Sequence, residues 1–359
     1  MTDSPSKKTR RLREPNGGAR KTVRLEDVAV LAGVSTATVS RSINEPEKVN
    51  AEMRKRVLDA AAELGWIPNA AGRALASNRT HIVGAIIPTL DAEIFARQVS
   101  AMQSVFTRHG YTLFLGCSNY DPMAGYQQVR AMLTRGVEAL AIVGEDHPAE
   151  LFDLLKHHRV PYVVTYTYRL DSPHLCIGVD HRKAFRTMTR RLLEMGHRRF
   201  AAIFQPTESN RRVVDRIHGV ADELGDAGLP LPPERLTIGP ADMDRAARDF
   251  VELMAGRPDE RPTAVVCGND LLAIGALNGA RDLGLVAGRD FSITGFDDLA
   301  LASRIPPGLT TQWVDNYRIG ELAAGKLMNM IGKSDGPFES AELVPELRLR
   351  GSSGPAPSP

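Results

Sequence analysis

Residues 23–49 read VRLEDVAVLAGVSTATVSRSINEPEKV, and this stretch decides the fold of the N-terminal region. It holds two short helical patterns separated by a glycine. In the first pattern, apolar residues three and four positions apart share one helical face: Leu25, Val28, Ala29 and Ala32. Gly33 then permits a chain reversal, because glycine adopts backbone conformations that strain other residues. Ser35 is a favourable N-cap for a second helix that runs from Thr36 to about Ile43.

A third helix follows, with Asn50 as its cap and Gly65 at the position of a C-terminal stop. Residues 22–65 are therefore predicted to form an all-α helix-turn-helix domain, which we call the head. In such domains the second helix enters the DNA major groove and presents its N-terminal side chains to base edges. An ordinary three-helix bundle with a solvated polar face is the alternative.

The second helix offers three outward-facing candidates for base contact: Thr36, Ala37 and Arg41. An arginine can hold guanine O6 and N7 in a two-pronged contact, and short side chains can touch a thymine methyl group. Small polar residues on the same helix suit phosphate oxygens, which position a protein without specifying sequence: Ser35, Thr38, Ser40 and Asn44.

Charge is unevenly distributed along the 359 residues, although the net charge is only +2. Residues 1–80 hold 15 Lys and Arg against 9 Asp and Glu, and the remainder holds 30 against 34. Such asymmetry indicates that the basic part meets a polyanion. Residues 1–21 are expected to be a disordered basic tail, which either attracts phosphate or is a solvated tail without a role.

Residues 66–80 form a predicted hinge that begins WIPNAAGRALAS. A short helix is expected after Pro68, too short to be stable alone. It carries Arg73 and one large apolar residue, Leu75. In this context Leu75 is a candidate wedge that unstacks a base step from the minor groove.

Residues 81–350 alternate short apolar strand patterns with amphipathic helical patterns, from Ile82–Ile87 to Ser292–Phe296. This alternation predicts an α/β core with parallel sheets covered by helices on both faces. Its length favours two doubly wound lobes with a cleft between them. Ligands of such sheets bind beyond the carboxyl ends of the strands. Residues 351–359, GSSGPAPSP, are expected to be a flexible C-terminus.

Several classes of protein are disfavoured by what the sequence lacks. It has no secretory signal pattern and no apolar run of about 18 residues, so a cytoplasmic protein without a membrane partner is expected. Cys117, Cys176 and Cys267 follow no metal or redox spacing and are expected to be reduced structural thiols. No phosphate-cradling glycine motif, nucleophile elbow or metal-ligand spacing is present, so no catalytic residue, metal or cofactor is expected.

Residues 23–80 resemble the DNA-binding head and hinge of the lac repressor/galactose repressor family, without gaps. The resemblance implies a homodimer that binds double-stranded operator DNA, with hinge helices that fold on the operator. By position it implies base-edge contacts for Thr36, Ala37 and Arg41, and the minor-groove wedge for Leu75.

The resemblance continues, more loosely, to about residue 350. It is carried by GHRRFAAI (196–203), CGNDLLAIGAL (267–277), ITGFDDLALA (293–302) and PPGLTT (306–311). The core of that family is similar to periplasmic sugar-binding proteins, with two lobes, three crossovers and an effector in the cleft.

The resemblance implies that Arg216 occupies the family's effector-binding arginine position. Asn269 and Asp297 follow predicted strands, and a guanidinium, an amide and a carboxylate together suit a hydroxyl-rich ligand. Phe95 and Trp313 are candidates for stacking on a sugar face. Tyr166 stands where many relatives have an acid, so the identity of the ligand does not transfer simply.

Structural roles are the alternatives for several of these positions. Asn269 or Asp270 can cap the following helix, which is the preferred interpretation for Asp270. Asp298 can cap the turn after its strand. His197 is expected to be structural rather than a ligand.

The sequence thus predicts a ligand-responsive, sequence-specific DNA-binding transcription regulator, a repressor controlled by a sugar, sugar acid or similar metabolite. The alternatives are a cytosolic sugar-binding protein without a DNA role and an enzyme on a doubly wound fold. The intact head and the missing catalytic motifs argue against them. Effector identity, the direction of its action, the operator and dimer versus tetramer are left open.

Overall fold

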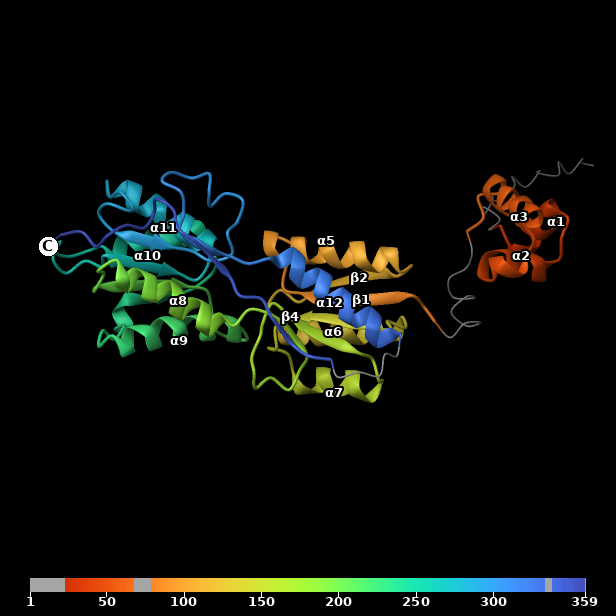
Figure 1. Ribbon diagram of the computed structural model, residues 1–359, viewed down its shortest axis with the longest axis horizontal. Coiled ribbons are helices and arrows are strands. Elements are labelled where there is room, and N and C mark those ends of the chain that lie inside the picture. The colour runs from red at the N-terminus through yellow and green to blue at the C-terminus, as the bar shows by residue number, and fades with distance from the viewer. Residues whose placement is uncertain (1–22, 68–78, 333–337, 359) are drawn as a thin grey trace, which may run out of the picture. The chain divides into compact units, whose positions relative to one another are not determined.

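The structure is a computed structural model that describes residues 23–67, 79–332 and 338–358. The chain divides into two compact units, Met1–Thr80 and His81–Pro359. Figure 1 draws the helices of the head and the two α/β lobes of the core.

The head has the three predicted helices, which pack around Val28, Val39 and Val57. The caps are also as predicted. Ser35 Oγ accepts the N–H of Thr38 at 3.1 Å, and Asn50 Oδ1 accepts the N–H of Met53 at 2.7 Å. The helical elements are α1 (Leu25–Ala32), α2 (Thr36–Asn44), the 3₁₀ turn η1 (Pro46–Lys48) and α3 (Ala51–Glu63).

The turn between α1 and α2 is secured from α3. Gly33 adopts the left-handed conformation, with φ of +62°, which is accessible to glycine at little cost. The Arg56 guanidinium donates to the carbonyl of Ala32, the last residue of α1. Because α1 ends with unsatisfied carbonyls, this bond stabilises the angle at which α2 leaves the turn.

The first lobe of the core, the N-lobe, has a parallel six-stranded sheet in the order β11-β5-β4-β3-β1-β2. Helices α5 and α12 cover one face, and α6 and α7 cover the other. Its elements are β1 (Ile82–Ile87), α5 (Glu93–Arg108), β2 (Thr112–Cys117), α6 (Pro122–Thr134), β3 (Leu140–Val143), α7 (Ala149–His157), β4 (Tyr162–Thr165), β5 (Cys176–Gly178), α12 (Asn316–Ile331) and β11 (Ala341–Glu342).

The second lobe, the C-lobe, has a parallel four-stranded sheet in the order β7-β6-β8-β9. Helices α8 and α9 lie on one face, and α10 and α11 lie on the other. Its elements are α8 (His181–Glu194), β6 (Phe200–Phe204), α9 (Arg211–Asp226), η2 (Pro233–Arg235), β7 (Leu236–Ile238), α10 (Met243–Leu253), β8 (Ala264–Cys267), α11 (Asp270–Asp282) and β9 (Ser292–Thr294).

The chain passes between the lobes three times within its described part: before α8, before α12 and after β11. The last two passes pair as antiparallel strands, β10 (Thr311–Trp313) and β12 (Glu346–Arg348). The predicted two-lobed core with three crossovers is therefore confirmed.

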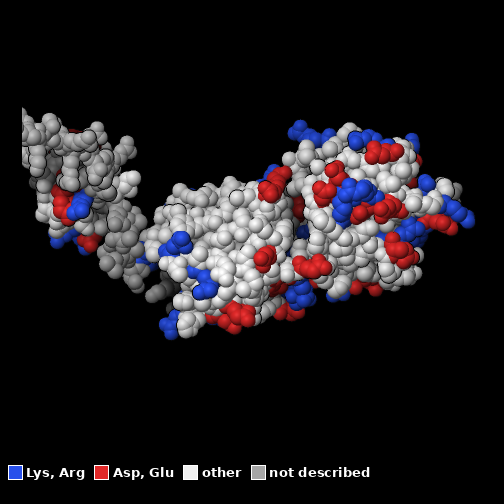
Figure 2. Space-filling view, turned by 180° about the vertical axis from the view of Figure 1, so that it is seen from behind, with Lys and Arg blue, Asp and Glu red and all other residues white. Residues whose placement is uncertain are grey.

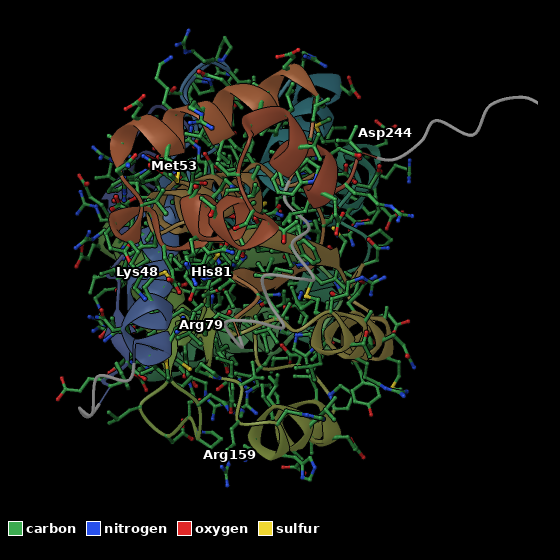
Figure 3. The ribbon with its side chains drawn as sticks, turned by 90° about the vertical axis from the view of Figure 1, so that its right-hand side faces the viewer. Lys48, Met53, Arg79, His81, Arg159 and Asp244 are labelled. Atoms are coloured by element: carbon green, nitrogen blue, oxygen red, sulfur yellow. The ribbon has the colours of Figure 1, made fainter. Side chains whose placement is uncertain are left out.

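The core begins with a fixed anchor at His81, which Figure 3 labels together with Arg79. The His81 backbone N–H donates to Glu138 Oε1 at 2.8 Å, and its ring lies 4.9 Å from the ring of Tyr111. The chain therefore enters β1 in a defined register.

The prediction of a flexible C-terminus was wrong for its first residues. Ser352 is completely buried, and its Oγ accepts the N–H of Thr310 at 2.8 Å and donates to the carbonyl of Ile293 at 2.7 Å. Ala356 donates its N–H to Met195 at 2.9 Å. The edge strand β9 leaves backbone groups to be satisfied, and this segment satisfies them, although its composition resembles a linker.

Charged side chains are interspersed over the C-lobe in the view of Figure 2, whereas the N-lobe face in that view carries few of them. Within the described residues, no helix is both long and apolar enough to cross a bilayer. The same residues contain no group of three or more His, Cys, Asp or Glu side chains suited to a metal ion.

Deleting residues 352–359 should destabilise the C-lobe, because the hydrogen bonds of buried Ser352 are lost. At about 1 kcal/mol for each bond, the melting temperature should fall by roughly 5 °C or more. Thermal unfolding followed by circular dichroism measures the change. Deletion of residues 357–359 is the matched control and should leave the melting temperature within about 1 °C of the full chain. Equal melting temperatures for both truncations would contradict the packed role of Ser352.

Candidate DNA interface and ligand cleft

The three predicted base-reading side chains of the head, Thr36, Ala37 and Arg41, are exposed on α2. Within the described residues, the Arg41 guanidinium donates to no acceptor. An exposed, uncommitted guanidinium on the first turns of such a helix is suited to a guanine edge.

The four predicted phosphate-contacting side chains are linked in pairs along α2. The hydroxyls of Ser35 and Thr38 lie 2.9 Å apart, and Asn44 Nδ2 donates to Ser40 Oγ at 3.2 Å. These local bonds restrict their rotamers, and a hydroxyl retains capacity for a phosphate oxygen. Arg73 and Leu75 of the predicted hinge lie outside the described residues.

A cleft of about 530 Å³ opens between the two lobes of the core. It lies at the carboxyl ends of the strands, as the α/β pattern predicted. Residues after β1, β2 and β4 line it from the N-lobe, and residues after β6, β8 and β9 line it from the C-lobe. Of the predicted effector contacts, five lie in its wall: Phe95, Tyr166, Arg216, Asn269 and Asp297.

One buried hydrogen bond in this cleft joins the two lobes. The Tyr166 hydroxyl, from the loop after β4, donates to Asp297 Oδ1, from the loop after β9. Burial raises the pKa of Asp297, while the positive charge of Arg216 acts in the opposite direction. Burial also raises the pKa of Tyr166 well above its usual value, so this hydroxyl remains a donor at neutral pH.

Arg216 is held by a chain of hydrogen bonds that fixes a histidine tautomer. Its Nη1 donates to the carbonyl of Gly268 at 2.6 Å, and its Nε donates to His181 Nδ1 at 3.2 Å. Because arginine has no acceptor, His181 Nδ1 must be unprotonated, and Nε2–H donates to the Tyr166 carbonyl at 2.8 Å. Burial lowers the pKa of His181 well below its usual value, so the ring is neutral. Arg216 also lies over the Phe296 ring at 4.4 Å.

Arg212, one turn before Arg216 on α9, was not among the predicted contacts. It lines the cleft and is only 6% exposed. Its carbon Cζ lies 5.6 Å from the centre of the Tyr166 ring. The sequence signal was an adjacent pair, Arg211 and Arg212, at the start of a predicted helix, and the pattern could not tell which one turns inward.

The predicted aromatic contacts have different outcomes. Phe95 lies in the cleft wall, but it is buried edge-on against Tyr166 with ring centres 5.7 Å apart. Trp313 does not line the cleft. It belongs to crossover strand β10, where Arg348 of the paired strand lies over its ring at 5.6 Å. Tyr120, which the sequence interpretation missed, lines the cleft and is half exposed, so its ring is free to stack on a ligand.

The capping alternatives are settled by hydrogen bonds. Asn269 Oδ1 accepts the N–H of Leu272 at 3.0 Å and caps α11, so the preferred cap, Asp270, was wrong. Asp298 forms an ion pair with Arg350 at 2.7 Å. His197 is structural, as expected: it is buried between the hydroxyls of Thr263 and Ser292.

Asp270 is instead a buried carboxyl at the start of α11, next to crossover strand β10. Its Oδ1 accepts the Thr311 hydroxyl at 2.6 Å, and its Oδ2 accepts the N–H of Leu299 at 2.7 Å. Burial raises its pKa to about 8. The protonated carboxyl is therefore the main form near neutral pH.

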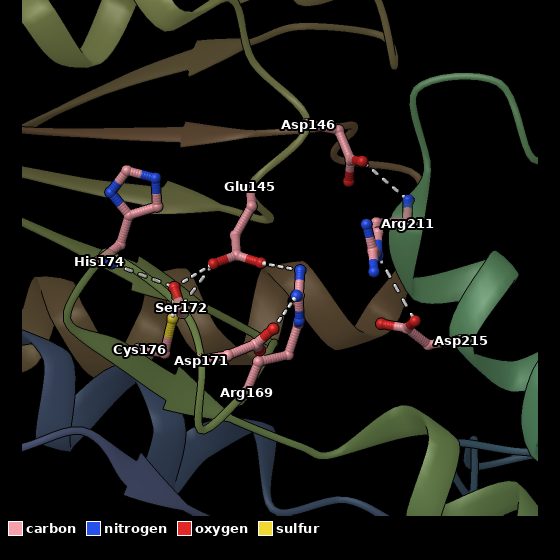
Figure 4. A network of polar contacts seen from close by, with 9 residues as sticks. All are labelled: Glu145, Asp146, Arg169, Asp171, Ser172, His174, Cys176, Arg211 and Asp215. Carbon is pink, nitrogen blue, oxygen red and sulfur yellow. Dashed lines mark hydrogen bonds and ion pairs between the residues drawn. The ribbon is translucent and has the colours of Figure 1, made fainter.

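Figure 4 shows polar contacts among the loop after β3, the segment between β4 and β5, and the start of α9. Glu145, after β3, accepts a hydrogen bond from Ser172 and pairs with Arg169 at 3.4 Å. The neighbouring Asp146 Oδ1 accepts the backbone N–H of Arg211 at 2.8 Å, which fastens the start of α9 in the C-lobe to the N-lobe. Cys176 in the same network has its pKa raised to about 11 by burial, so its thiol stays protonated.

Each of the two units of the chain matches a known protein family model. Residues 24–69 match the family model of bacterial regulatory proteins, lacI family, and residues 189–353 match a periplasmic binding protein-like domain. The HTH-type transcriptional repressor PurR of Erwinia tasmaniensis is 32% identical over 338 residues, which span 93% of this chain and 97% of that protein. The chain belongs to the lacI family of bacterial regulatory proteins.

Solved structures of lacI-family regulators share this architecture. A lacI-family transcriptional regulator from Silicibacter pomeroyi superimposes with a TM-score of 0.84 at 25% identity, over 92% of this chain and 99% of that one. The transcriptional regulator CelR in complex with cellobiose has a TM-score of 0.67 at 26% identity, over 92% of this chain and 99% of that one. The chain is thus a ligand-responsive regulator that binds operator DNA, and it is not an enzyme.

Replacing Asp270 with Asn should flatten the dependence of stability on pH. The folded-state pKa of Asp270 is about 8 and its ordinary value is 3.8, so between these values the folded protein holds a proton that the unfolded chain releases. Stability therefore falls as pH rises through this window. The melting temperature of the native chain should drop between pH 5 and pH 8 by about 5 °C more than that of Asp270→Asn.

Differential scanning calorimetry at several pH values measures this difference. Exposed Asp282, on the same helix, supplies the control variant Asp282→Asn, which should follow the native curve. Parallel curves for Asp270→Asn and the native chain would show that Asp270 is ionised in the fold.

Proposed function

We propose that the cleft binds a hydroxyl-rich small metabolite, a sugar or sugar acid, and that this ligand sets the affinity of the paired heads for operator DNA. The observation that carries the proposal is the buried polar cluster of Tyr166, Arg216 and Asp297. It faces an open cleft and draws on both lobes. The affinity of a ligand bound there therefore depends on the relative position of the lobes.

The hydrogen-bonding groups of the cleft suit hydroxyls, which both donate and accept. Gln205 Oε1 and Asn210 Oδ1 are buried in the wall and accept no hydrogen bond from a described residue. Buried polar atoms are normally satisfied, so these are acceptors for ligand hydroxyls. Tyr120 and Phe95 supply apolar surface for a sugar ring, and the cellobiose complex of CelR supports a saccharide-like ligand.

The coupling rests on unequal binding to two lobe arrangements. A ligand with equal affinity for both arrangements shifts nothing. Here a ligand hydroxyl that donates to Asp297 competes with the Tyr166 hydroxyl, so it alters the bond that joins the lobes. The lobe arrangement in turn determines the separation of the two hinges of a dimer.

The DNA-reading role is assigned to α2 and the hinge. Thr36, Ala37 and Arg41 contact base edges, while Ser35, Thr38, Ser40 and Asn44 contact phosphates. Arg73 and Leu75 act in the minor groove. A two-fold symmetric dimer implies a two-fold symmetric operator, and the site of action is the cytoplasm.

Replacing Arg216 with Lys should remove the effector response while leaving operator binding intact. Lysine keeps the charge but lacks the planar fork that serves Gly268, His181 and the ligand. The effector-induced change in operator affinity should fall at least about tenfold, whereas affinity without effector should change less than about threefold. Fluorescence anisotropy measures both, with an operator selected from a random duplex library and an effector found by thermal-shift screening. Arg211→Lys, at the exposed start of the same helix, is the control. A full response in Arg216→Lys would overturn the role of Arg216.

Replacing Arg41 with Ala should relax sequence preference more than it weakens binding to random duplex. A lost two-pronged guanine contact costs about 1–3 kcal/mol of discrimination. The ratio of specific to random-duplex affinity, measured by anisotropy at fixed salt, should therefore fall roughly tenfold or more. Arg54→Ala, at an exposed position on α3, is the control. An equal loss on both duplexes would make Arg41 a phosphate contact.

A further inference from the structure

The guanidinium of Arg212 is the unusual feature of the cleft, because it is buried and no described residue pairs with it or accepts a hydrogen bond from it. Arg212 is 6% exposed, and within the described residues its side chain makes no hydrogen bond or ion pair. Its Nε is fully buried and unsatisfied. The group lies over the Tyr166 ring and lines both the main cleft and a small cavity beside it.

Two other enclosed arginines of the C-lobe have protein partners, although Nε of Arg245 lacks one, as Nε of Arg212 does. Arg216 donates to Gly268 and His181, and Arg245 pairs with Asp249 at 2.8 Å and donates to the Phe204 carbonyl. Removing an ion from water is costly unless a partner offsets it. Arg212 therefore has the bonding capacity that a bound anion would use.

The backbone around Arg212 favours the same charge. Arg212 is the second residue of the 16-residue helix α9, and its N-cap residue, Asn210, makes no side-chain cap. Asp146 satisfies the N–H of Arg211, but the N–H of Arg212 has no acceptor among the described residues. Free N–H groups at a helix N-terminus attract anions through the helix dipole.

The charged side chains around the cleft indicate how many negative charges the bound anion carries. Two buried guanidinium groups, Arg212 and Arg216, face one buried carboxylate, Asp297, which already accepts the Tyr166 hydroxyl. The exposed rim adds Asp91 and Glu208, which repel a multiply charged ligand. One negative charge matches this site, and two do not.

We propose that the effector is a polyhydroxy acid whose carboxylate binds Arg212 at the N-terminus of α9, while its hydroxyls contact Arg216, Asp297 and the unsatisfied amide oxygens. This inference rests on the proposed function, since it specifies the ligand of the same cleft. A neutral sugar would leave two buried guanidinium groups, Arg212 and Arg216, with the single carboxylate of Asp297. A phosphate would bring a second negative charge toward Asp91 and Glu208.

The first test measures ligand charge preference with the purified full-length protein. Isothermal titration compares gluconate, galactonate, glucuronate and galacturonate with their neutral counterparts sorbitol, galactitol, glucose and galactose, and adds glucose 6-phosphate. At least one acid should bind about tenfold or more tightly than its neutral counterpart and than the phosphate. Arg212→Met should weaken that acid at least about tenfold, Arg212→Lys should retain the preference, and the neighbouring Arg211→Met should bind as the native chain does.

The second test needs no ligand. If Arg212 awaits an anion, Arg212→Met removes an uncompensated buried charge, so the melting temperature of the ligand-free protein should rise by a few degrees, with Arg211→Met unchanged. A bound acid should then stabilise the native chain but not Arg212→Met.

The proposal is overturned if no acid binds, if a neutral sugar or the phosphate binds as tightly as every acid, or if Arg212→Met lowers the ligand-free melting temperature. A neutral sugar that releases or recruits the operator would leave the proposed function standing. An acid that binds through Arg212 without changing operator affinity would instead refute the proposed function.

Discussion

The hydrogen bond from Tyr166 to Asp297 is the interaction on which the geometry of the cleft depends. Both residues have positive φ, +62° and +104°, in a region that non-glycine residues rarely adopt. Such conformations cost about 1–3 kcal/mol each and persist only where surrounding contacts fix them. Here those contacts include His181, which binds the Tyr166 carbonyl, and the backbone N–H of Asp297, which donates to Gln312 of a crossover strand. Tyr166 and Asp297 are therefore both buried, both strained in the backbone, and joined by a hydrogen bond between the lobes.

The sequence predicted the elements of the fold well because both periodicities are strong. Local conformational preferences and tertiary packing agree at several places. Examples are the glycine between α1 and α2, the caps Ser35 and Asn50, and the apolar strand Phe200–Phe204. The C-terminal segment was mispredicted for the opposite reason. Its Gly, Ser and Pro composition carries no local signal, and only the unpaired edge of β9, distant in sequence, gives buried Ser352 its partners.

The candidate site was predictable in position but not in detail. Strand ends located Tyr166, Asn269 and Asp297, because parallel strands bring their carboxyl ends to one edge. Which side chains are committed elsewhere depends on contacts between distant segments. Asn269 caps a helix and Trp313 contacts a crossover arginine, whereas Arg212 turns inward and has no hydrogen-bond partner in the described part of the chain. The amino-acid sequence alone does not show whether a side chain is already paired with a residue that is distant in the chain.

The energetics of switching explain why one cross-lobe bond is insufficient by itself. Moving a two-state equilibrium from about 1:99 to 99:1 requires about 5.5 kcal/mol of differential binding. A hydrogen bond to a charged group contributes about 1.5–3 kcal/mol, so a ligand that only displaced the Tyr166 hydroxyl from Asp297 would shift the populations partially. The ligand must also engage groups that separate when the lobes move. The N-terminus of α9 is such a group, because Asp146 of the N-lobe holds it by the Arg211 N–H. Arg212 and Asp297 both belong to the C-lobe, and each lies beside a contact with the N-lobe: the bond from the Arg211 N–H to Asp146 and the bond from the Tyr166 hydroxyl to Asp297. A ligand bound between them is therefore adjacent to both of these cross-lobe contacts.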